Sequence, residues 1–352
     1  MKICVGRKAC FVFTVFLMLT LFSFSASTLA ASPMDNLSGT ESTSESHDED
    51  GGNTDASAGN NKSGNVPAIN NVSRNYYEYN GRDREYWLYV PDSALEGDES
   101  SQLILALHGS NSSGFQMMYG TKLNRIAANE NIIIIYPTAL YSKEHGMTYW
   151  ENNDEDIGFL LGLIDLIEEE YNIDKSRVYG VGFSNGAGMI QNLAIQESAD
   201  FAAVAACSPA YFDEEYYNFP DYVSDVAIMF TCGDNDKYML SFEGNSAIDG
   251  VGAEKHLEYW RNYYDFDQED YTYTKEGLYN TYTFYSENDL PVCEWVEVNG
   301  KEHEFWVTEG QRIYEFLSSY RKMPDGRLLY NNTTLVEASG VKKYIQLKDQ
   351  MS

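Results

Sequence analysis

Ser184 lies at the centre of a glycine-spaced motif that fits a tight turn between a strand and a helix. Residues 182–186 read Gly-Phe-Ser-Asn-Gly, with an apolar, β-branched stretch before them and a helix-like run, residues 189–196, after them. In such a turn small residues relieve the crowding, so that the serine hydroxyl projects alone beside a helix N-terminus that favours negative charge. The motif therefore predicts a nucleophile at Ser184. The alternative is a glycine-rich turn that only caps a helix.

Two phosphate-binding loops are excluded for this segment. A dinucleotide-binding loop that starts at Gly180 would need its third glycine where Asn185 stands, and a phosphate-binding loop would end in Gly-Lys-Ser or Gly-Lys-Thr. Metal-binding patterns such as His-Glu-x-x-His or paired Cys-x-x-Cys do not occur either. We therefore expect no cofactor and no metal.

A serine nucleophile of this kind needs a histidine base further along the chain, because the triad order in this architecture is Ser, acid, His. Of the five histidines, only His256 and His303 follow Ser184. His256 lies in an amphipathic helical pattern, where we expect a surface or partly packed residue. His303 follows a strand and an Asn-Gly turn in a loop, and loops at strand ends commonly present catalytic groups. We therefore predict His303 as the general base.

The acidic residue of the triad should follow a strand that comes after Ser184 in the sequence. Residues 226–231 form a continuous apolar run that is typical of a strand buried on both faces, and Cys-Gly-Asp-Asn-Asp follows at once. Asp234 or Asp236 could orient the imidazole, and the other would be a solvated turn residue.

An oxyanion hole needs two backbone N–H groups, one from the residue after the nucleophile and one from a loop after an earlier strand. Asn185 is the first. The second should come from the loop that begins His-Gly-Ser at residues 108–110, after the apolar strand of residues 103–107. We expect His108 to brace this loop and to take no part in proton transfer.

Composition divides the chain into four segments. Residues 1–31 read as a signal peptide, with three basic residues, an apolar run and small residues at the cleavage site. Residues 32–75 contain no aromatic residue and read as a disordered, acidic linker rich in Ser, Asn and Gly. Residues 76–322 form the predicted enzyme domain, and residues 323–352 are a C-terminal extension whose role the sequence does not indicate.

Strand and helix patterns alternate within residues 76–322. A hairpin with an Asn-Gly turn opens the domain. The expected strands and helices then follow one another as in a mostly parallel central sheet with helices on both faces. The predicted fold class is therefore α/β. Three cysteines remain after the signal peptide, Cys207, Cys232 and Cys293, so at most one disulfide could form within the chain.

The chain resembles the esterase/polyhydroxybutyrate depolymerase group of α/β-hydrolases, which includes the feruloyl and acetylxylan esterases of carbohydrate esterase family 1. The resemblance runs from about Tyr86 to Arg321. The residues that carry it are Tyr-Val-Pro at 89–91, Leu-His-Gly at 107–109, Tyr-Pro at 136–137, Asp-Ile-Gly-Phe at 156–159, Tyr-Asn-Ile-Asp at 171–174 and Arg-Val-Tyr at 177–179.

The resemblance implies an α/β-hydrolase fold and roles for particular residues. In this group a Gly-x-x-Asp turn carries the acid, which implies Asp236, and the residue after Leu-His-Gly supplies an oxyanion N–H, which implies Ser110. Many members have Cys where Ser110 stands, and the His303 loop lacks the group's Trp-Pro-Gly ending.

A secreted serine esterase with the triad Ser184, Asp236 and His303 is therefore the predicted function. The expected substrates are feruloyl or acetyl esters of plant polysaccharide, or a polyester. A secreted serine peptidase of the same fold and a catalytically silent binding module are the alternatives. The net charge of −30 excludes nucleic acid as a partner. We expect no membrane association once the signal is cleaved, an uncleaved anchor being the alternative, and the oligomeric state stays open.

Overall fold

The computed structural model describes residues 71–196, 200–209, 224–238, 251–264, 266–267, 269–286, 289–331, 333–338 and 341–346. All of them belong to one compact unit, residues 59–352. The predicted signal peptide and residues 32–70 of the predicted linker lie outside the described residues.

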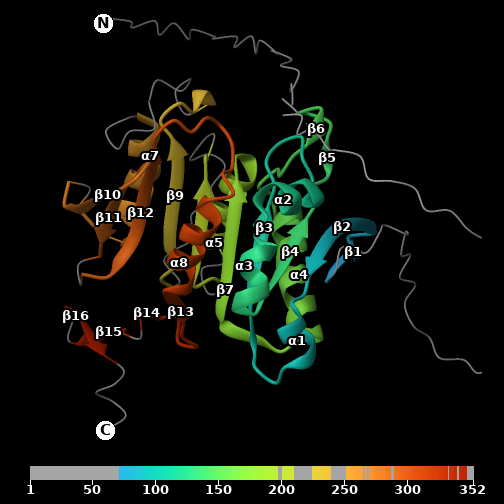
Figure 1. The fold of residues 1–352 in the computed structure, drawn as a ribbon, viewed down its shortest axis with the longest axis horizontal. Helices are drawn as coiled ribbons and strands as arrows, with labels where there is room; N and C mark the ends of the chain where they lie inside the picture. The colour runs from blue at the N-terminus through green and yellow to red at the C-terminus, as the bar shows by residue number, and fades with distance from the viewer. Residues whose placement is uncertain are drawn as a thin grey trace, which may run out of the picture. The chain divides into compact units, whose positions relative to one another are not determined.

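A ten-stranded sheet forms the centre of this unit (Figure 1). Its order is β1 (Val72–Tyr79), β2 (Arg82–Tyr89), β4 (Ile132–Pro137), β3 (Ser101–Leu107), β7 (Ile173–Phe183), β8 (Ala203–Cys207), β9 (Ala227–Gly233), β12 (Pro291–Val298), β11 (Tyr279–Tyr285) and β10 (Tyr271–Glu276). The strands from β4 to β12 in this order run parallel, and antiparallel strands flank them on both sides.

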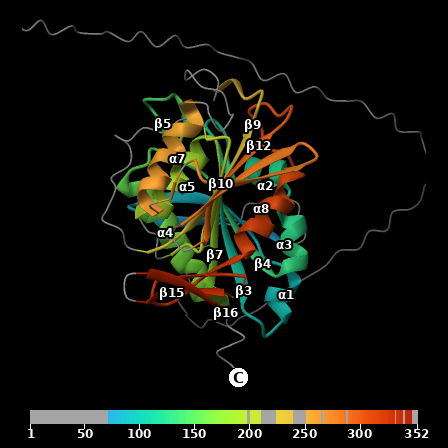
Figure 2. The ribbon, with the colours of Figure 1, turned by 90° about the vertical axis from the view of Figure 1, so that its left-hand side faces the viewer.

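Helices cover both faces of the sheet. Figure 2 shows α4 (Asp154–Glu170), α5 (Asn185–Gln196) and α7 (Val251–Tyr264) on one side, and α2 (Gly114–Thr121), α3 (Asn124–Glu130) and α8 (Glu309–Ser318) on the other. A short helix, α1 (Asp92–Glu96), precedes β3, and a small β-hairpin, β5 (Tyr141–Ser142) and β6 (Met147–Thr148), precedes α4. The predicted α/β class, with a mostly parallel sheet between two helical layers, is confirmed.

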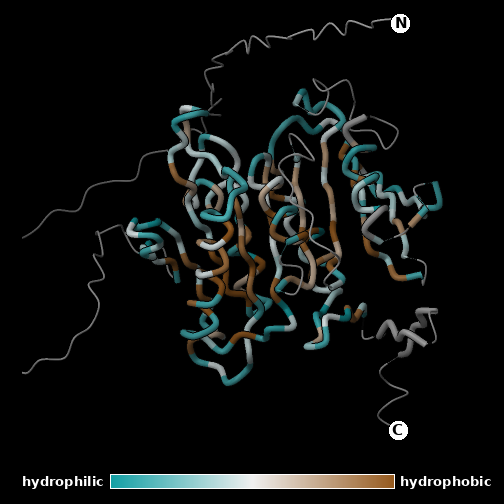
Figure 3. The backbone as a smooth tube through the Cα atoms, turned by 180° about the vertical axis from the view of Figure 1, so that it is seen from behind, coloured by the Kyte–Doolittle hydropathy of each residue, from teal (hydrophilic) through white to brown (hydrophobic). Residues whose placement is uncertain are grey.

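The parallel strands form the hydrophobic core. Every residue of β3, β4, β8 and β9 is buried, and the hydrophobic stretches of the backbone lie in these central strands (Figure 3). Burial on both faces explains why these strands read as continuous apolar runs in the sequence. By contrast, β10 is exposed along its whole length, and the sequence analysis did not predict it.

Helix α4 shows how the sequence defines the start of an element. The side chain of Asn153 accepts a hydrogen bond from the backbone N–H of Asp156 at 3.0 Å, and three acidic residues occupy the first turn. Both features stabilise a helix N-terminus. The apolar stripe that contains Ile157, Leu160 and Ile164 is buried against the sheet.

Strands also extend past both predicted domain boundaries. The first, β1, starts at Val72, four residues before the expected boundary at 76, because its whole length pairs with β2. At the other end, β13 (Tyr320–Lys322) pairs with β14 (Leu328–Tyr330) beyond residue 322, and Leu328 is buried. Two further strands, β15 (Thr333–Ala338) and β16 (Val341–Gln346), complete a four-stranded antiparallel sheet.

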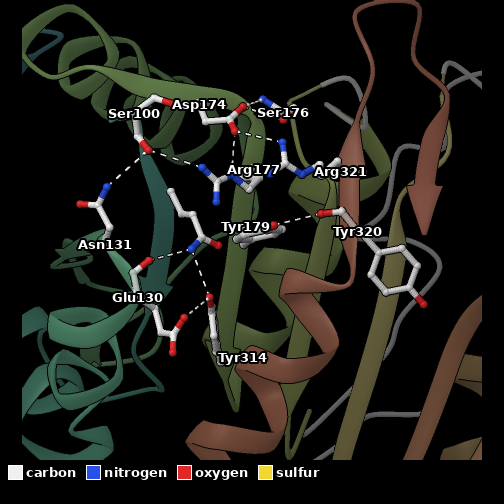
Figure 4. A network of polar contacts seen from close by, with 11 residues as sticks. Ser100, Glu130, Asn131, Asp174, Ser176, Arg177, Tyr179, Tyr314, Tyr320 and Arg321 are labelled. Atoms are coloured by element: carbon white, nitrogen blue, oxygen red, sulfur yellow. Dashed lines mark hydrogen bonds and ion pairs between the residues drawn. The ribbon is translucent and has the colours of Figure 1, made fainter. Parts of the chain in front are cut away.

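A polar network lies at the amino end of β7 (Figure 4). Asp174 accepts hydrogen bonds from the N–H and hydroxyl of Ser176, from Nε of Arg177 at 2.7 Å and from Nη1 of Arg321 at 3.3 Å. These hydrogen bonds outweigh the opposing effect of burial, so that the pKa of Asp174 is lowered. The network joins β7 to β13 at the end of the strand opposite Ser184.

The turn of the β1–β2 hairpin can be tested with two glycines. Asn80 and Gly81 both have positive φ, 50° and 74°, as a type I′ turn requires. We expect Gly81→Ala to lower the free energy of unfolding by about 1 kcal/mol, because a Cβ disfavours this conformation although nothing lies within 4 Å of it. Gly120→Ala, equally uncrowded but in helix α2, should be neutral or stabilising by up to about 1 kcal/mol. Urea unfolding measures both, and equal effects would contradict this account.

Candidate active site

Ser184 is the single residue between β7 and α5, and its φ of 55° lies in the left-handed region. A non-glycine residue adopts this conformation only when its surroundings hold it there. Its N–H donates to the carbonyl of Cys207 at 3.0 Å, and its own carbonyl accepts from the N–H of Ala187 at 2.9 Å. Both backbone groups are therefore fixed, and the side chain is left to project from the turn.

The two flanking glycines are sterically required. A Cβ on Gly182 would lie 2.1 Å from the carbonyl oxygen of Gly186, and one on Gly186 would lie 2.5 Å from the carbonyl oxygens of Leu107 and His108. Backbone atoms cannot move aside as a flexible side chain can. The glycine spacing read from the sequence therefore reflects close approach of backbone on both sides of Ser184.

Two adjacent loops bring His303 and Asp236 to Ser184. They follow β12 and β9, which pair in parallel, so that their carboxyl ends lie at the same edge of the sheet. His303 Nε2 lies 2.9 Å from Ser184 Oγ, and His303 Nδ1 lies 2.9 and 3.1 Å from the two carboxylate oxygens of Asp236. A carboxylate only accepts, so Nδ1 carries the proton and Nε2 is free to accept from the serine hydroxyl.

Asp236 and Asp234 differ in what they contact. The side chain of Asp236 is fully buried, and its Oδ1 also accepts from the N–H of Tyr238 at 3.0 Å. Asp234 points elsewhere and accepts from the N–H of Gly300 at 2.6 Å. Of the two carboxylates that the sequence offered, it is Asp236 that lies against His303, while Asp234 joins its own loop to the turn before His303.

His108 is the first residue of the loop that follows β3. Its Nδ1 donates to the carbonyl of Gly109 at 2.6 Å, and its Nε2 accepts from the N–H of Ala139 at 3.0 Å. Burial lowers the pKa of His108 to about 4, so the ring is neutral near pH 7. These contacts brace the loop, as the sequence led us to expect.

His256 differs from expectation in its burial. We predicted a surface or partly packed residue on α7, but its exposed fraction is 2%. The ring packs against Phe230 and Trp295 from the sheet, with Nδ1 3.2 Å from the side-chain oxygen of Gln191. Burial lowers its pKa to about 3. An amphipathic pattern shows that one helix face is apolar, but not that a histidine will be enclosed beside it.

The backbone segments that contain the two predicted oxyanion donors adjoin Ser184. Asn185 follows it directly, and the backbone just before Ser110 passes close by, since a Cβ on Gly109 would lie 3.1 Å from the Ser184 Cβ. The loop that follows β3 and the first residue of α5 thus both lie beside Ser184.

Trp150 supports this arrangement and was missed in the sequence. Its indole N–H donates to the carbonyl of His108 at 3.0 Å. The side-chain amide of Asn185 accepts from the Trp150 N–H at 2.8 Å and donates to its carbonyl at 3.0 Å. Trp150 therefore connects the loop after β3 to the first residue of α5, next to Ser184. It lies between elements, where no periodic pattern marks a residue as buried.

The other reactive groups of the described residues include three cysteines. Cys207, Cys232 and Cys293 are buried free thiols, and burial raises the pKa of Cys207 to about 12. Among the described residues, no three His, Cys, Asp or Glu side chains gather in a way that could hold a metal ion. In the same part of the chain, no helix is both long and apolar enough to cross a membrane.

Comparison with known proteins gives matches in sequence. Residues 84–239 match the sequence model of the family described as Esterase PHB depolymerase. A bifunctional acetylxylan esterase/xylanase from Neocallimastix patriciarum is 30% identical over 134 residues, which are 38% of this chain and 19% of that protein. Feruloyl esterase B from Thermothelomyces thermophilus is 31% identical over 137 residues, 36% of this chain and 45% of that protein. The chain thus spans less than half the length of these two relatives.

A solved structure matches over a larger share. Acetyl xylan esterase from Aspergillus awamori is similar over 70% of this chain and 98% of that one, with a TM-score of 0.54 and 14% sequence identity. At that identity the likeness concerns the fold alone. The fold is therefore the α/β-hydrolase fold. Within that fold, residues 84–239 match the esterase/polyhydroxybutyrate depolymerase group, in agreement with the resemblance seen in the sequence.

The two buried histidines generate a prediction for stability. Their pKa values, about 4 for His108 and about 3 for His256, lie below the value of about 6.5 expected in the unfolded chain. The unfolded chain therefore binds protons more readily, and the stability contributed by the neutral rings is lost as pH falls from about 6.5 towards about 4. We expect His256→Gln to reduce the slope of unfolding free energy against pH in this range by up to about 1.4 kcal/mol per pH unit. Denaturant titrations at several pH values measure the slope, and an unchanged slope would contradict the burial of His256.

Proposed function

We propose that this chain is a serine carboxylic-ester hydrolase that works through an acyl-enzyme. The observation that carries the proposal is the pair of contacts made by His303, 2.9 Å from Ser184 Oγ on one side and 2.9 Å from Asp236 on the other. A nucleophile within hydrogen-bond reach of a base, which a third group orients, is the arrangement that activates a serine hydroxyl. The left-handed backbone of Ser184 adds to it, because strain of this kind is concentrated at functional sites.

The proposed reaction has two halves. Ser184 Oγ attacks the ester carbonyl while His303 Nε2 takes the hydroxyl proton, and the N–H groups of Ser110 and Asn185 stabilise the negative oxygen that forms. His303 then protonates the departing alcohol, which leaves an acyl group on Ser184. Water attacks this acyl group, giving its proton to His303, and His303 returns the proton to Ser184 Oγ as the free acid is released. Asp236 stays ionised and stabilises the imidazolium in both halves.

Feruloyl or acetyl esters of plant polysaccharide are the proposed substrates, with polyester-type substrates as the next candidates. Two relatives of the matched region carry the names feruloyl esterase and acetylxylan esterase, which supports these ester classes. A chain with a net charge of −30 also favours a neutral, ester-bearing polymer over an anionic one. We include export in the proposal, with residues 1–31 as its signal and with an uncleaved anchor as the alternative.

Two other functions remain to be separated from this one. A serine peptidase would use the same residues on an amide, and a binding module would keep the fold without turnover. Hydrolysis of feruloyl, acetyl and hydroxybutyrate esters, set against a panel of peptides, separates esterase from peptidase. Covalent labelling by a fluorophosphonate probe separates either enzyme from a binding module, since the probe reacts only with an activated serine.

The nucleophile assignment gives a direct test. Ser184→Ala should fold, because alanine is smaller and makes no new contact, but ester hydrolysis should fall by about 10³–10⁶-fold and probe labelling should disappear. Thermal unfolding of the variant controls for its fold. Retention of more than about a tenth of the wild-type activity would contradict the role of Ser184.

The two aspartates give a second test with its own control. Asp236→Asn keeps the shape but removes the charge beside His303, so kcat should fall on the order of 10³–10⁴-fold. Asp234→Asn keeps an oxygen that can accept from Gly300, so we expect less than a tenfold loss. The assignment of the acid would move to Asp234 if the two effects were reversed in steady-state assays.

A further inference from the structure

A buried ion pair lies beside the loop that carries His303. Lys301 Nζ lies 2.8 Å from Glu309 Oε1, and the two side chains have exposed fractions of 0% and 1%. Removing two charges from water is costly, and a pair of apolar residues of similar size would often stabilise a fold as well or better. Stability alone therefore does not explain why this pair is charged. An ion pair with hydrogen-bond geometry does, however, fix the relative position of the two segments that carry it.

The pair joins three parts of the structure. Lys301 lies two residues before His303, and its Nζ also lies 3.5 Å from the hydroxyl of Thr231 on β9. Glu309 is the first residue of α8, and its second carboxylate oxygen accepts from the N–H of Trp306 at 2.9 Å. The ion pair thus closes the loop of residues 301–309 on itself and fixes it to the sheet and to α8.

The loop that carries Asp236 meets the same segment from the other side. The carbonyl of Lys301 accepts from the N–H of Asn235 at 3.0 Å, and Asp234 accepts from the N–H of Gly300 at 2.6 Å. The approach is so close that a Cβ on Gly233 would lie 2.0 Å from the Lys301 carbonyl oxygen. The backbone of Lys301 is therefore bonded to the loop that carries Asp236, and its side chain is paired with α8.

We propose that Lys301 and Glu309 are positioning residues that keep the His303 side chain within hydrogen-bond distance of both Ser184 and Asp236. This inference rests on the proposed hydrolase function. His303 is carried by a loop rather than by a helix or strand, and it must keep two contacts of 2.9 Å at the same time. A displacement of about 1 Å at such a site can lower the rate by about 100-fold. The ion pair limits the movement of the loop and so fixes the position of His303.

The test is the double variant Lys301→Met/Glu309→Leu, which removes both charges and leaves neither one buried alone. We expect it to fold, with kcat lowered by about 10–100-fold and KM changed by less than about threefold. The rate of fluorophosphonate labelling of Ser184 should fall together with kcat, because labelling depends on His303 but not on substrate binding. A merely structural role would lower the melting temperature and leave both rates of the folded protein unchanged.

Asp174→Asn provides the matched control. Asp174 accepts charge-assisted hydrogen bonds from Arg177 and Arg321 (Figure 4), but it lies ten residues before Ser184 on the same strand, which is roughly 30 Å away in extended chain. Loss of this ion pair should lower the melting temperature without changing kcat or the labelling rate. If the double variant fails to fold, Lys301→Gln/Glu309→Gln, which also removes both charges and keeps an acceptor for the N–H of Trp306, gives the same comparison.

The outcomes separate this inference from the function on which it rests. Wild-type protein that neither hydrolyses esters nor reacts with the probe would overturn the proposed function. Wild-type activity together with a folded ion-pair variant whose kcat and labelling rate lie within twofold of the wild type would overturn the positioning role alone. A fall in kcat equal to that of Asp174→Asn would also overturn it, because the effect would then be general.

Discussion

The close approach of backbone segments around Ser184 is the constraint on which the rest of this structure depends. The turn between β7 and α5 is so tight that Gly182 faces the carbonyl of Gly186, and Gly186 faces the carbonyls at the end of β3. This contact fixes where α5 starts and brings the loop after β3 beside the serine. A chain that builds this turn has therefore also brought two backbone segments close to the Ser184 side chain.

Parallel pairing supplies the other half of the site. Because β9 and β12 are neighbours and run in the same direction, the loops that follow them leave the sheet at one edge, and Asp236 meets His303 there. The geometry of these loops depends on contacts between them, on the hydrogen bond from Gly300 to Asp234, and on the buried pair Lys301–Glu309.

The histidines show how burial separates chemical roles within one residue type. His108 and His256 are enclosed, and their lowered pKa values keep them neutral, so they act as hydrogen-bonding parts of the scaffold. His303 keeps a partly exposed ring between a hydroxyl and a carboxylate. The same side chain is thus a brace in two places and a candidate proton carrier in the third, and the difference lies in which groups surround the ring.

The sequence by itself determined the strand–turn–helix at Ser184, the central buried strands and the place of His303 after the last sheet strand. These features depend on local sterics and on runs of apolar residues, which are written in consecutive positions. It did not determine that His256 is enclosed, that Trp150 links two loops, that β10 forms an exposed edge, or that Lys301 and Glu309 are buried together.

Asp234 and Asp236 stand two residues apart with the same chemistry, and only the resemblance favoured one of them. In each case the deciding contact comes from a segment distant in sequence, so only the tertiary structure could place it.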